Sequence, residues 1–128
     1  MTTTATTAGE AFARAVAAKD QAALCAVLSD TIDFQALTPG RVFRAESGAE
    51  AAVEVILGTW FARAQMDELC AVTTGQVAGR EHVAYRVRVH AGVDEYLIEQ
   101  QAYYDTADDG RICWMRVLCS GYQPAAAA

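Results

Sequence analysis

Glu99, Gln101 and Tyr103 are the residues of this sequence whose types and spacing best suit acid–base chemistry. They alternate along the run from Tyr96 to Tyr104, and alternate residues of a strand point to the same face. A carboxyl group, a carboxamide and a phenol would then form one row. If this row borders an apolar cavity, Glu99 can transfer a proton while its neighbours orient the reacting molecule.

A structural role explains the same row equally well. Glu99 can form a hydrogen bond with Tyr103, with Tyr85 or with a backbone amide, because buried polar groups in proteins are nearly always paired. The chemical and the structural interpretation both stay open on the sequence alone.

Cys119, near the end of the last run, is a candidate nucleophile. A reactive thiol needs a neighbouring base or cation. His82 and His90 lie at opposite ends of one run, and alternation places His90 on its outer side. No Cys–His pair is therefore predicted, and because buried cysteine usually behaves as a small apolar residue, we expect Cys119 to line a binding site. His82, beside a turn, is expected to be solvated.

Helices occupy most of the first half of the chain. Thr7 and Glu10 have the spacing of a capping box, which predicts a helix ending near Lys19 with Phe12 on its buried face. Asp20 can cap a second short helix. A third helix is predicted behind Ser47 and Glu50, with a single apolar stripe formed by Val53, Ile56, Leu57, Trp60 and Phe61.

Strands occupy the second half. A short strand, 31–37, buries Ile32, Phe34 and Ala36 and ends at the Pro39-Gly40 turn. Four longer runs follow at 69–77, 82–90, 96–104 and 112–122, separated by turn-like segments, which indicates an antiparallel meander. In the run 82–90 the inward face is Val83, Tyr85, Val87 and Val89. Helices followed by strands are typical of an α+β fold.

Composition narrows the classes of function. The chain has 128 residues, 53% of them hydrophobic, with 16 acidic and 10 basic residues and a net charge of −6. One core is expected, and nucleic-acid binding is not, because the basic residues form no cluster. The four cysteines show no metal-binding spacing, so free thiols and no metal are expected. The first residues resemble no secretory signal and no run is long enough to span a bilayer, so a cytoplasmic location is expected and no membrane partner.

Taken together, this order of elements resembles the nuclear transport factor 2-like superfamily, and within it the SnoaL-like, ketosteroid-isomerase-like branch. The resemblance covers about residues 10–123, with Asp109-Gly110-Arg111-Ile112 as its most recognisable motif. The stretches 33–41 and 117–122 look similar to uncharacterised actinobacterial members. The resemblance implies one domain over residues 1–128, with 1–6 and 124–128 frayed. It also implies a cone-shaped, curved antiparallel sheet packed on three helices and enclosing a pocket.

Anchoring the resemblance on that motif implies which residues face the pocket. Glu99 falls where ketosteroid isomerase holds its protonated aspartate. Phe12 falls at or near the position of the isomerase's oxyanion tyrosine, and the position of its catalytic base falls within 34–36, where no carboxylate stands. Steroid isomerisation by that machinery is therefore not expected. The lining expected around Glu99, Tyr103 and Gln101 is Tyr85, Val87, Met115, Val117, Cys119, Trp60, Phe34 and Phe12.

Two functions from different classes follow. The first is a cofactor-free enzyme that isomerises, cyclises or hydrates a small apolar metabolite, with Glu99 and Tyr103 as catalytic residues. The alternative is a non-catalytic ligand-binding or dimerisation module. In either case we expect a homodimer through the outer sheet face, formed by Arg86, Arg88, Gln100, Trp114 and Arg116. A solvated face, with its arginines paired to Glu81, Asp94 or Glu95, is the alternative for that surface.

Overall fold

The structure is a computed structural model and describes residues 7–125. Residues 1–6 and 126–128, predicted to be frayed, lie outside the described residues. Pro124 is paired with Tyr96, and the backbone N–H of Ala125 donates to the carbonyl of Glu95 at 3.0 Å. The prediction that fraying begins at residue 124 is therefore wrong for these two residues.

The first two helices form where capping residues occur in the sequence. Helix α1 (Ala8–Ala18) begins at Thr7, whose hydroxyl accepts a hydrogen bond from the Glu10 amide at 3.1 Å. It ends at Lys19, which adopts a left-handed conformation. Helix α2 (Gln21–Val27) begins at Asp20, whose carboxylate accepts from the Ala23 amide at 3.0 Å. Both ends of α1 and the start of α2 confirm the prediction.

The third helix, η1 (Glu50–Trp60), is wound more loosely than an α-helix. Its turns close between residues five apart, so that the amide of Phe61 donates to the carbonyl of Ile56 at 3.0 Å. Buried residues therefore recur every four to five positions, and Val55 is buried while Val53 is 39% exposed. The predicted stripe is wrong at Val53, because it assumed the tighter winding of an α-helix.

A seven-stranded sheet forms the rest of the molecule, in the order β2-β1-β6-β5-β4-β3, with β7 paired to β5. The strands are β1 (Leu28–Thr38), β2 (Arg41–Ala45), β3 (Gln65–Val77), β4 (Arg80–Ala91), β5 (Asp94–Thr106), β6 (Ile112–Cys119) and β7 (Gln123–Pro124). The α+β cone is confirmed. The antiparallel prediction needs one correction, because β1 and β6 run parallel, with Phe34 opposite Met115.

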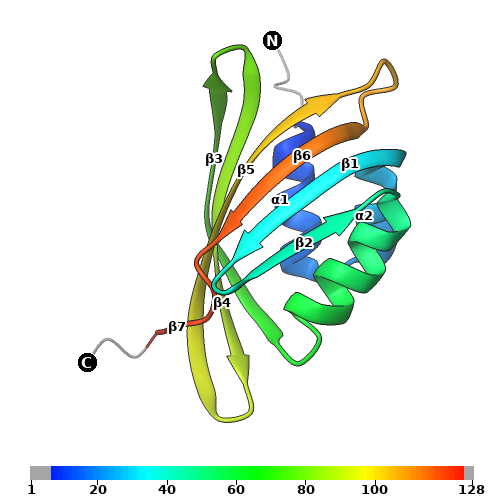
Figure 1. The fold of residues 1–128 in the computed structure, drawn as a ribbon. Helices are drawn as coiled ribbons and strands as arrows, with labels where there is room; N and C mark the ends of the chain where they lie inside the picture. Colours follow the sequence, from blue (N-terminus) through cyan, green and yellow to red (C-terminus); the bar gives the residue numbers. More distant parts are fainter. Residues whose placement is uncertain (1–6, 126–128) are drawn as a thin grey trace.

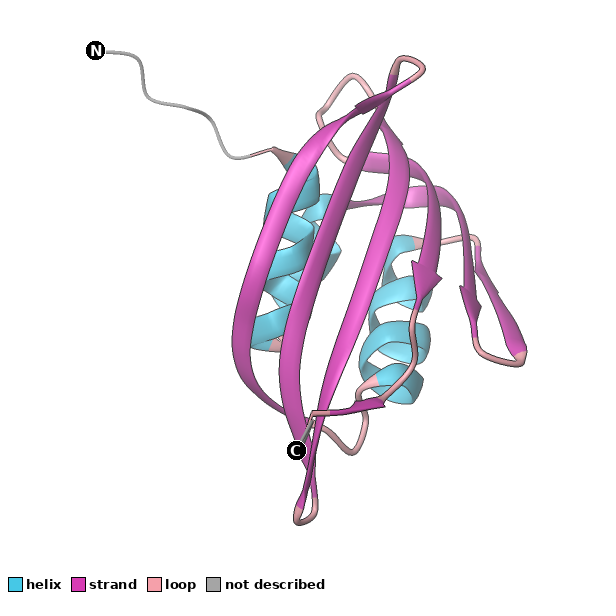
Figure 2. Ribbon diagram, turned by 90° about the vertical axis from the view of Figure 1, so that its left-hand side faces the viewer, coloured by secondary structure: helices cyan, strands magenta, loops and turns pink. Residues whose placement is uncertain are grey.

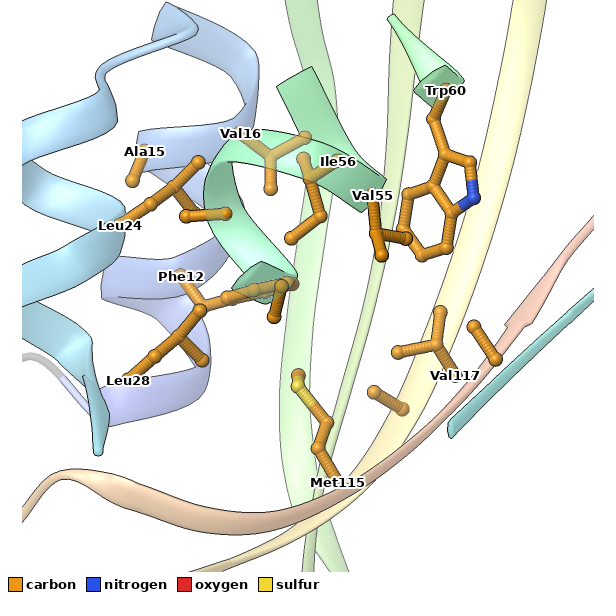
Figure 3. Close-up of a cluster of buried hydrophobic side chains, with 14 of the residues drawn as sticks. Phe12, Ala15, Val16, Leu24, Leu28, Val55, Ile56, Trp60, Met115 and Val117 are labelled. Atoms are coloured by element: carbon orange, nitrogen blue, oxygen red, sulfur yellow. The ribbon is translucent and has the colours of Figure 1, made fainter. Parts of the chain in front are cut away.

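The helices lie on the concave side of the curved sheet. Figures 1 and 2 show α1, α2 and η1 gathered on one side while the long strands β3 to β6 bend around them. Side chains from both layers form one buried cluster, in which Phe12, Leu24, Ile56 and Met115 are fully enclosed. Figure 3 shows these helix and strand side chains pointing toward one another. Within residues 7–125, no helix combines the length and apolar character needed to cross a membrane.

Candidate functional site

The predicted catalytic row lies on the outer face of the sheet, away from the helices. Glu99 is about 60% exposed and forms an ion pair with Arg86 at 3.2 Å. Gln101 is exposed and contacts His82 at 3.0 Å, and Tyr103 is 37% exposed. The prediction that these residues point into the cone is therefore wrong, and no carboxylate enters the interior from β5.

The residues of β5 that do face the helices are Ile98, Gln100, Ala102 and Tyr104. Hydrogen-bond register explains this, because Gln100 lies directly opposite Tyr85 on β4, and directly opposite residues share a face. The predicted inward direction of Tyr85 is correct. Since Gly92 and Val93 form a two-residue turn between β4 and β5, the register follows from that turn. Applied to the sequence, this hairpin rule would have predicted that Gln100, and not Glu99, points inward.

Most of the other predicted lining residues do point into the interior. Figure 3 shows several of them in one cluster beneath the helices. The buried ones are Phe12, Phe34, Trp60, Tyr85, Val87, Met115 and Val117. Cys119 is half-buried at the end of β6. Phe12 packs edge-on against Tyr85, with 6.3 Å between ring centroids.

A polar row crosses three strands inside this apolar interior. Tyr85 on β4, Gln100 on β5 and Cys119 on β6 are opposite one another in register. The Tyr85 hydroxyl donates a hydrogen bond to the side-chain oxygen of Gln100. Gln100 is 3% exposed and, apart from the aromatic residues, is the one polar or charged residue among 7–125 that is buried.

Tyr85 is held in its neutral form. Burial raises the pKa of Tyr85 well above its ordinary value, and the nearby Cys119 raises it further. The phenol therefore stays a hydrogen-bond donor at physiological pH. Because the oxygen of Gln100 accepts this bond, the N–H groups of its amide are directed elsewhere.

The raised pKa of Tyr85 predicts a loss of stability at high pH. The unfolded chain ionises this tyrosine near pH 10 whereas the folded chain keeps its proton, so the stabilisation is complete below about pH 10 and declines above it. The free energy of unfolding should fall above about pH 10. Tyr85 alone should contribute about 1.4 kcal/mol to this fall for each pH unit. Urea denaturation between pH 9 and 11 measures it. An equally steep slope in Tyr85→Phe would contradict the assignment.

An open pocket of about 420 Å³ lies at the mouth of the cone. It is walled by the end of η1, the β1–β2 turn, β2, β5 and the segment that follows β6. Its lining residues include Phe43, Trp60, Phe61, Ile98, Cys119 and Tyr122. The size is within the range of small-molecule sites, and such sites are mostly apolar with a few polar groups.

Three hydrogen bonds and one close approach of the backbone fix the rim of this mouth pocket. The Lys19 ammonium donates to the carbonyls of Phe61 and Ala64, at 2.7 and 3.0 Å, and so holds the end of η1 against α1. The Tyr122 hydroxyl donates to the carbonyl of Trp60 at 2.6 Å. Gly121, at φ +75°, lets the chain pass Pro39 where a Cβ would lie 2.9 Å from the proline ring.

Three buried donors have no hydrogen-bond partner within residues 7–125: the Nε of Arg111, near the start of β6, and two in or near the mouth of the cone. The latter two are the indole Nε1 of Trp60, which lines the mouth pocket, and the amide Nε2 of Gln100. Gln100 does not line the mouth pocket itself but lies two residues along β5 from Ile98 in its wall, a step of about 7 Å, and it also borders the larger hollow of the outer face. An unmade bond to a buried donor costs about 1–3 kcal/mol, so the Trp60 and Gln100 donors favour a bound acceptor atom.

The interior offers hydrogen-bond donors and no base. Asp33, the carboxylate nearest the predicted base position, is about 59% exposed and pairs with Arg116 at 3.1 Å. Among residues 7–125, no carboxylate or imidazole is buried in the core, and no group of three potential metal ligands occurs. The buried donors of the interior can bind and polarise a neutral molecule. Within the part of the chain that the structure describes, the interior contains no carboxylate that could act as a base toward that molecule.

The outer sheet face differs in one residue from the predicted dimer surface. Gln100 lies inside the cone, so its assignment to this face is wrong. Arg86 and Arg88 are exposed and pair with Glu99 and Glu68 on this same face rather than with the predicted partners. Trp114 has the guanidinium of Arg116 at 4.5 Å from its ring centroid.

A hollow of about 580 Å³ on the outer face is larger than the mouth pocket. Its lining includes the small residues Ala71 and Ala84 and the Arg86–Glu99 pair, and it also includes Tyr85, Gln100 and Cys119. Alternating charges of this kind suit a second copy of the chain better than an apolar ligand. The homodimer stays a prediction, and light scattering of the protein in solution tests it.

Comparisons with known proteins agree on the fold. No family model and no curated protein matches the sequence. A solved structure from Rhodopseudomonas palustris has 12% identity and a TM-score of 0.69, covering 92% of this chain and 93% of that one.

Two further structures have names that point to enzymes. An LEH-like epoxide hydrolase of M. tuberculosis has 20% identity and a TM-score of 0.62, covering 88% of this chain and 80% of that one. A ketosteroid isomerase-like protein from Erwinia carotovora atroseptica has 21% identity and a TM-score of 0.58, with coverages of 88% and 90%. At these identities the likeness establishes the fold alone. The chain therefore has the predicted nuclear transport factor 2-like fold.

Proposed function

We propose that this protein binds a small, neutral, largely apolar molecule in the mouth pocket and recognises a hydrogen-bond acceptor on it, such as a carbonyl oxygen. The observation that carries the proposal is the pair of buried, unpartnered donors on Trp60 and Gln100. The walls of Phe43, Trp60, Phe61 and Ile98 supply apolar contact. An acceptor atom bound there would give these donors hydrogen-bond partners and complete the polar interior.

Binding without proton transfer is favoured over the acid–base enzyme. That enzyme depended on Glu99 in the cavity, and Glu99 instead pairs with Arg86 outside it. The solved structures named as an epoxide hydrolase and as ketosteroid isomerase-like share the fold with this chain. Similarity of fold does not transfer an activity, so binding is the conclusion that the residues of this chain support.

A matched pair of ligands tests the recognised group. We expect 1-tetralone, a bicyclic ketone, to bind the wild-type protein about tenfold more tightly than tetralin, which has the same ring system and no oxygen. Gln100→Met keeps the length of the side chain and removes its donor, so the preference for the ketone should fall toward onefold. Isothermal titration calorimetry measures both affinities.

Glu99→Gln is the control for this experiment. It changes an outer-face residue of the same strand and should leave both affinities and their ratio unchanged. Equal binding of the two ligands by the wild-type protein would contradict the recognition of an acceptor. Loss of ketone binding in Glu99→Gln, with Gln100→Met unaffected and folded by circular dichroism, would restore the outer row as the site.

A further inference from the structure

The four cysteines within residues 7–125 are free thiols, and Cys119 is the one that lines the mouth pocket. Its sulfur accepts a hydrogen bond from the backbone N–H of Gly121 at 3.3 Å. The neighbouring lining is aromatic and aliphatic. A molecule that enters the mouth pocket therefore meets a thiol directly.

We propose that Cys119 captures neutral α,β-unsaturated carbonyl compounds covalently inside the mouth pocket. The proposal rests on the proposed binding function and adds to it a class of ligand and a bond. Such compounds combine the two features that the pocket recognises, an apolar carbon skeleton and an acceptor oxygen. These compounds also have a third feature, an electrophilic β-carbon, which a thiol can attack.

Trp60 provides an observation that is independent of the thiol. Its side chain is only 8% exposed, it lines the same pocket as Cys119, and its indole Nε1 has no partner within residues 7–125. Figure 3 shows the indole nitrogen on the side of the ring turned away from Val55 and Ile56. A carbonyl oxygen that accepts from a donor in this wall is held in the pocket that contains the sulfur.

The reaction is an addition that needs no oxidant. Cys119 loses its thiol proton to water, and a sulfur electron pair forms the S–C bond at the β-carbon of the unsaturated ketone. The π electrons of the C=C bond move toward the carbonyl and give an enolate. A proton from water then adds to the α-carbon, so the product is a saturated ketone bonded to sulfur, and nothing leaves.

The addition is accelerated mainly because the pocket holds the unsaturated carbonyl compound next to the Cys119 sulfur, and less because the thiol itself is unusually reactive. The Gly121 N–H donates to the sulfur and favours the negative charge that develops on it. The Lys19 ammonium is engaged by the carbonyls of Phe61 and Ala64. The guanidinium of Arg41 lies over the ring of Phe43, 4.3 Å from its centroid. Holding the electrophile beside the thiol raises its effective concentration, so the labelling rate of Cys119 should saturate with reagent concentration.

Mass spectrometry of tryptic peptides tests the proposal with 2-cyclohexen-1-one as the probe. At neutral pH we expect Cys119 to be labelled roughly tenfold faster than Cys25, Cys70 or Cys113, with a rate that reaches a plateau as the probe concentration rises. Excess 1-tetralone should slow labelling at Cys119 alone. Trp60→Phe, which keeps an aromatic ring, should raise the half-saturating concentration by about tenfold.

Cys119→Ser separates this proposal from the binding function. If the serine variant binds 1-tetralone as the wild type does, and wild-type Cys119 reacts no faster than the other three cysteines, covalent capture is wrong while the pocket stands. A rate that rises linearly with probe concentration, without protection by 1-tetralone, also overturns capture. Loss of 1-tetralone binding by both proteins would instead reject the proposed function.

Discussion

Gly9→Ala should lower the free energy of unfolding by about 3 kcal/mol and the Tm by roughly 10 °C. A Cβ at Gly9 would lie 2.7 Å from the hydroxyl of Tyr104 and 2.9 Å from Cβ of Val83. The Gly9 amide also donates to that hydroxyl at 2.9 Å, which ties α1 to the sheet. Alanine is the better helix former by up to about 1 kcal/mol, so a large loss can only come from the clash. Thermal denaturation followed by circular dichroism measures it.

Two variants complete this test. Gly75→Ala is the control, because Gly75 is exposed on β3 with no atom within 4 Å of the added carbon, and its stability should hardly change. Tyr104→Phe added to Gly9→Ala removes the clashing oxygen but keeps ring carbon Cε1, which also lies 2.7 Å from the added carbon, so it should recover only a small part of the loss. A Gly9→Ala protein as stable as wild type would show that α1 does not approach the sheet this closely.

Arg111→Met should cost about 2–3 kcal/mol of stability. The guanidinium of Arg111 donates to the carbonyls of Cys25 and Leu28, at 3.3 and 2.7 Å, and to the carboxylate of Asp30 at 3.0 Å. These bonds hold the negative end of α2 against the start of β6. Methionine leaves the carbonyls without their charged partner, and urea denaturation measures the loss.

Arg63→Met is the matched control, since Arg63 is exposed at the end of η1 and its replacement should change stability by less than about 0.5 kcal/mol. Arg111→Lys should recover only part of the loss, because all three bonds come from one nitrogen, Nη2, at the far end of the guanidinium, which the shorter lysine side chain must reach with its ammonium group. If Arg111→Met unfolds at the same urea concentration as wild type, the motif at 109–112 does not stabilise the fold in this way.

Local signals in the sequence predicted the elements well. Thr7 and Asp20 cap the helices that they were expected to cap. The alternation from Val83 to Val89 identified the buried face of β4, because its outward positions are charged or small. Such signals act within a few residues, and for this reason one sequence suffices to read them.

The sequence alone did not show in the same way which face of β5 points toward the helices. Ile98-Gln100-Ala102-Tyr104 and Leu97-Glu99-Gln101-Tyr103 both mix apolar and polar residues, so alternation fits either choice. Register across the β4–β5 hairpin decides between them. The prediction relied on an anchor at residues 109–112, beyond an irregularity in the pairing of β5 with β6 near Thr106. A shift of one residue there exchanges the two faces.

The mouth pocket depends on contacts distant in sequence. Its walls come from the turn at Pro39, from Trp60 at the end of η1, from Ile98 and from the segment around Tyr122. The hydrogen bond from Tyr122 to the Trp60 carbonyl joins residues 62 positions apart. The burial of Trp60 was predicted, but whether its indole Nε1 finds a partner depends on residues distant in sequence, such as Phe43 and Tyr122, that wall the same pocket.

The position of Gln100 also changes the chemistry that the fold can support. A carboxylic acid at this place could lose a proton, whereas a carboxamide keeps one set of donors and acceptors at every physiological pH. Tyr85 stays protonated beside it, since burial raises its pKa. The proposed binding should therefore be insensitive to pH, and the affinity for 1-tetralone should not vary between pH 6 and 9.

Side-chain NMR during a titration with 1-tetralone distinguishes a binding site inside the cone, near Gln100, from one on the outer face at Glu99. The Trp60 indole N–H and the Gln100 amide N–H resonances should shift together and saturate with one dissociation constant. Signals of the outer-face residues Arg86 and Gln101 should remain in place. Saturating shifts of the outer-face signals, with the Trp60 and Gln100 resonances unmoved, would contradict the account.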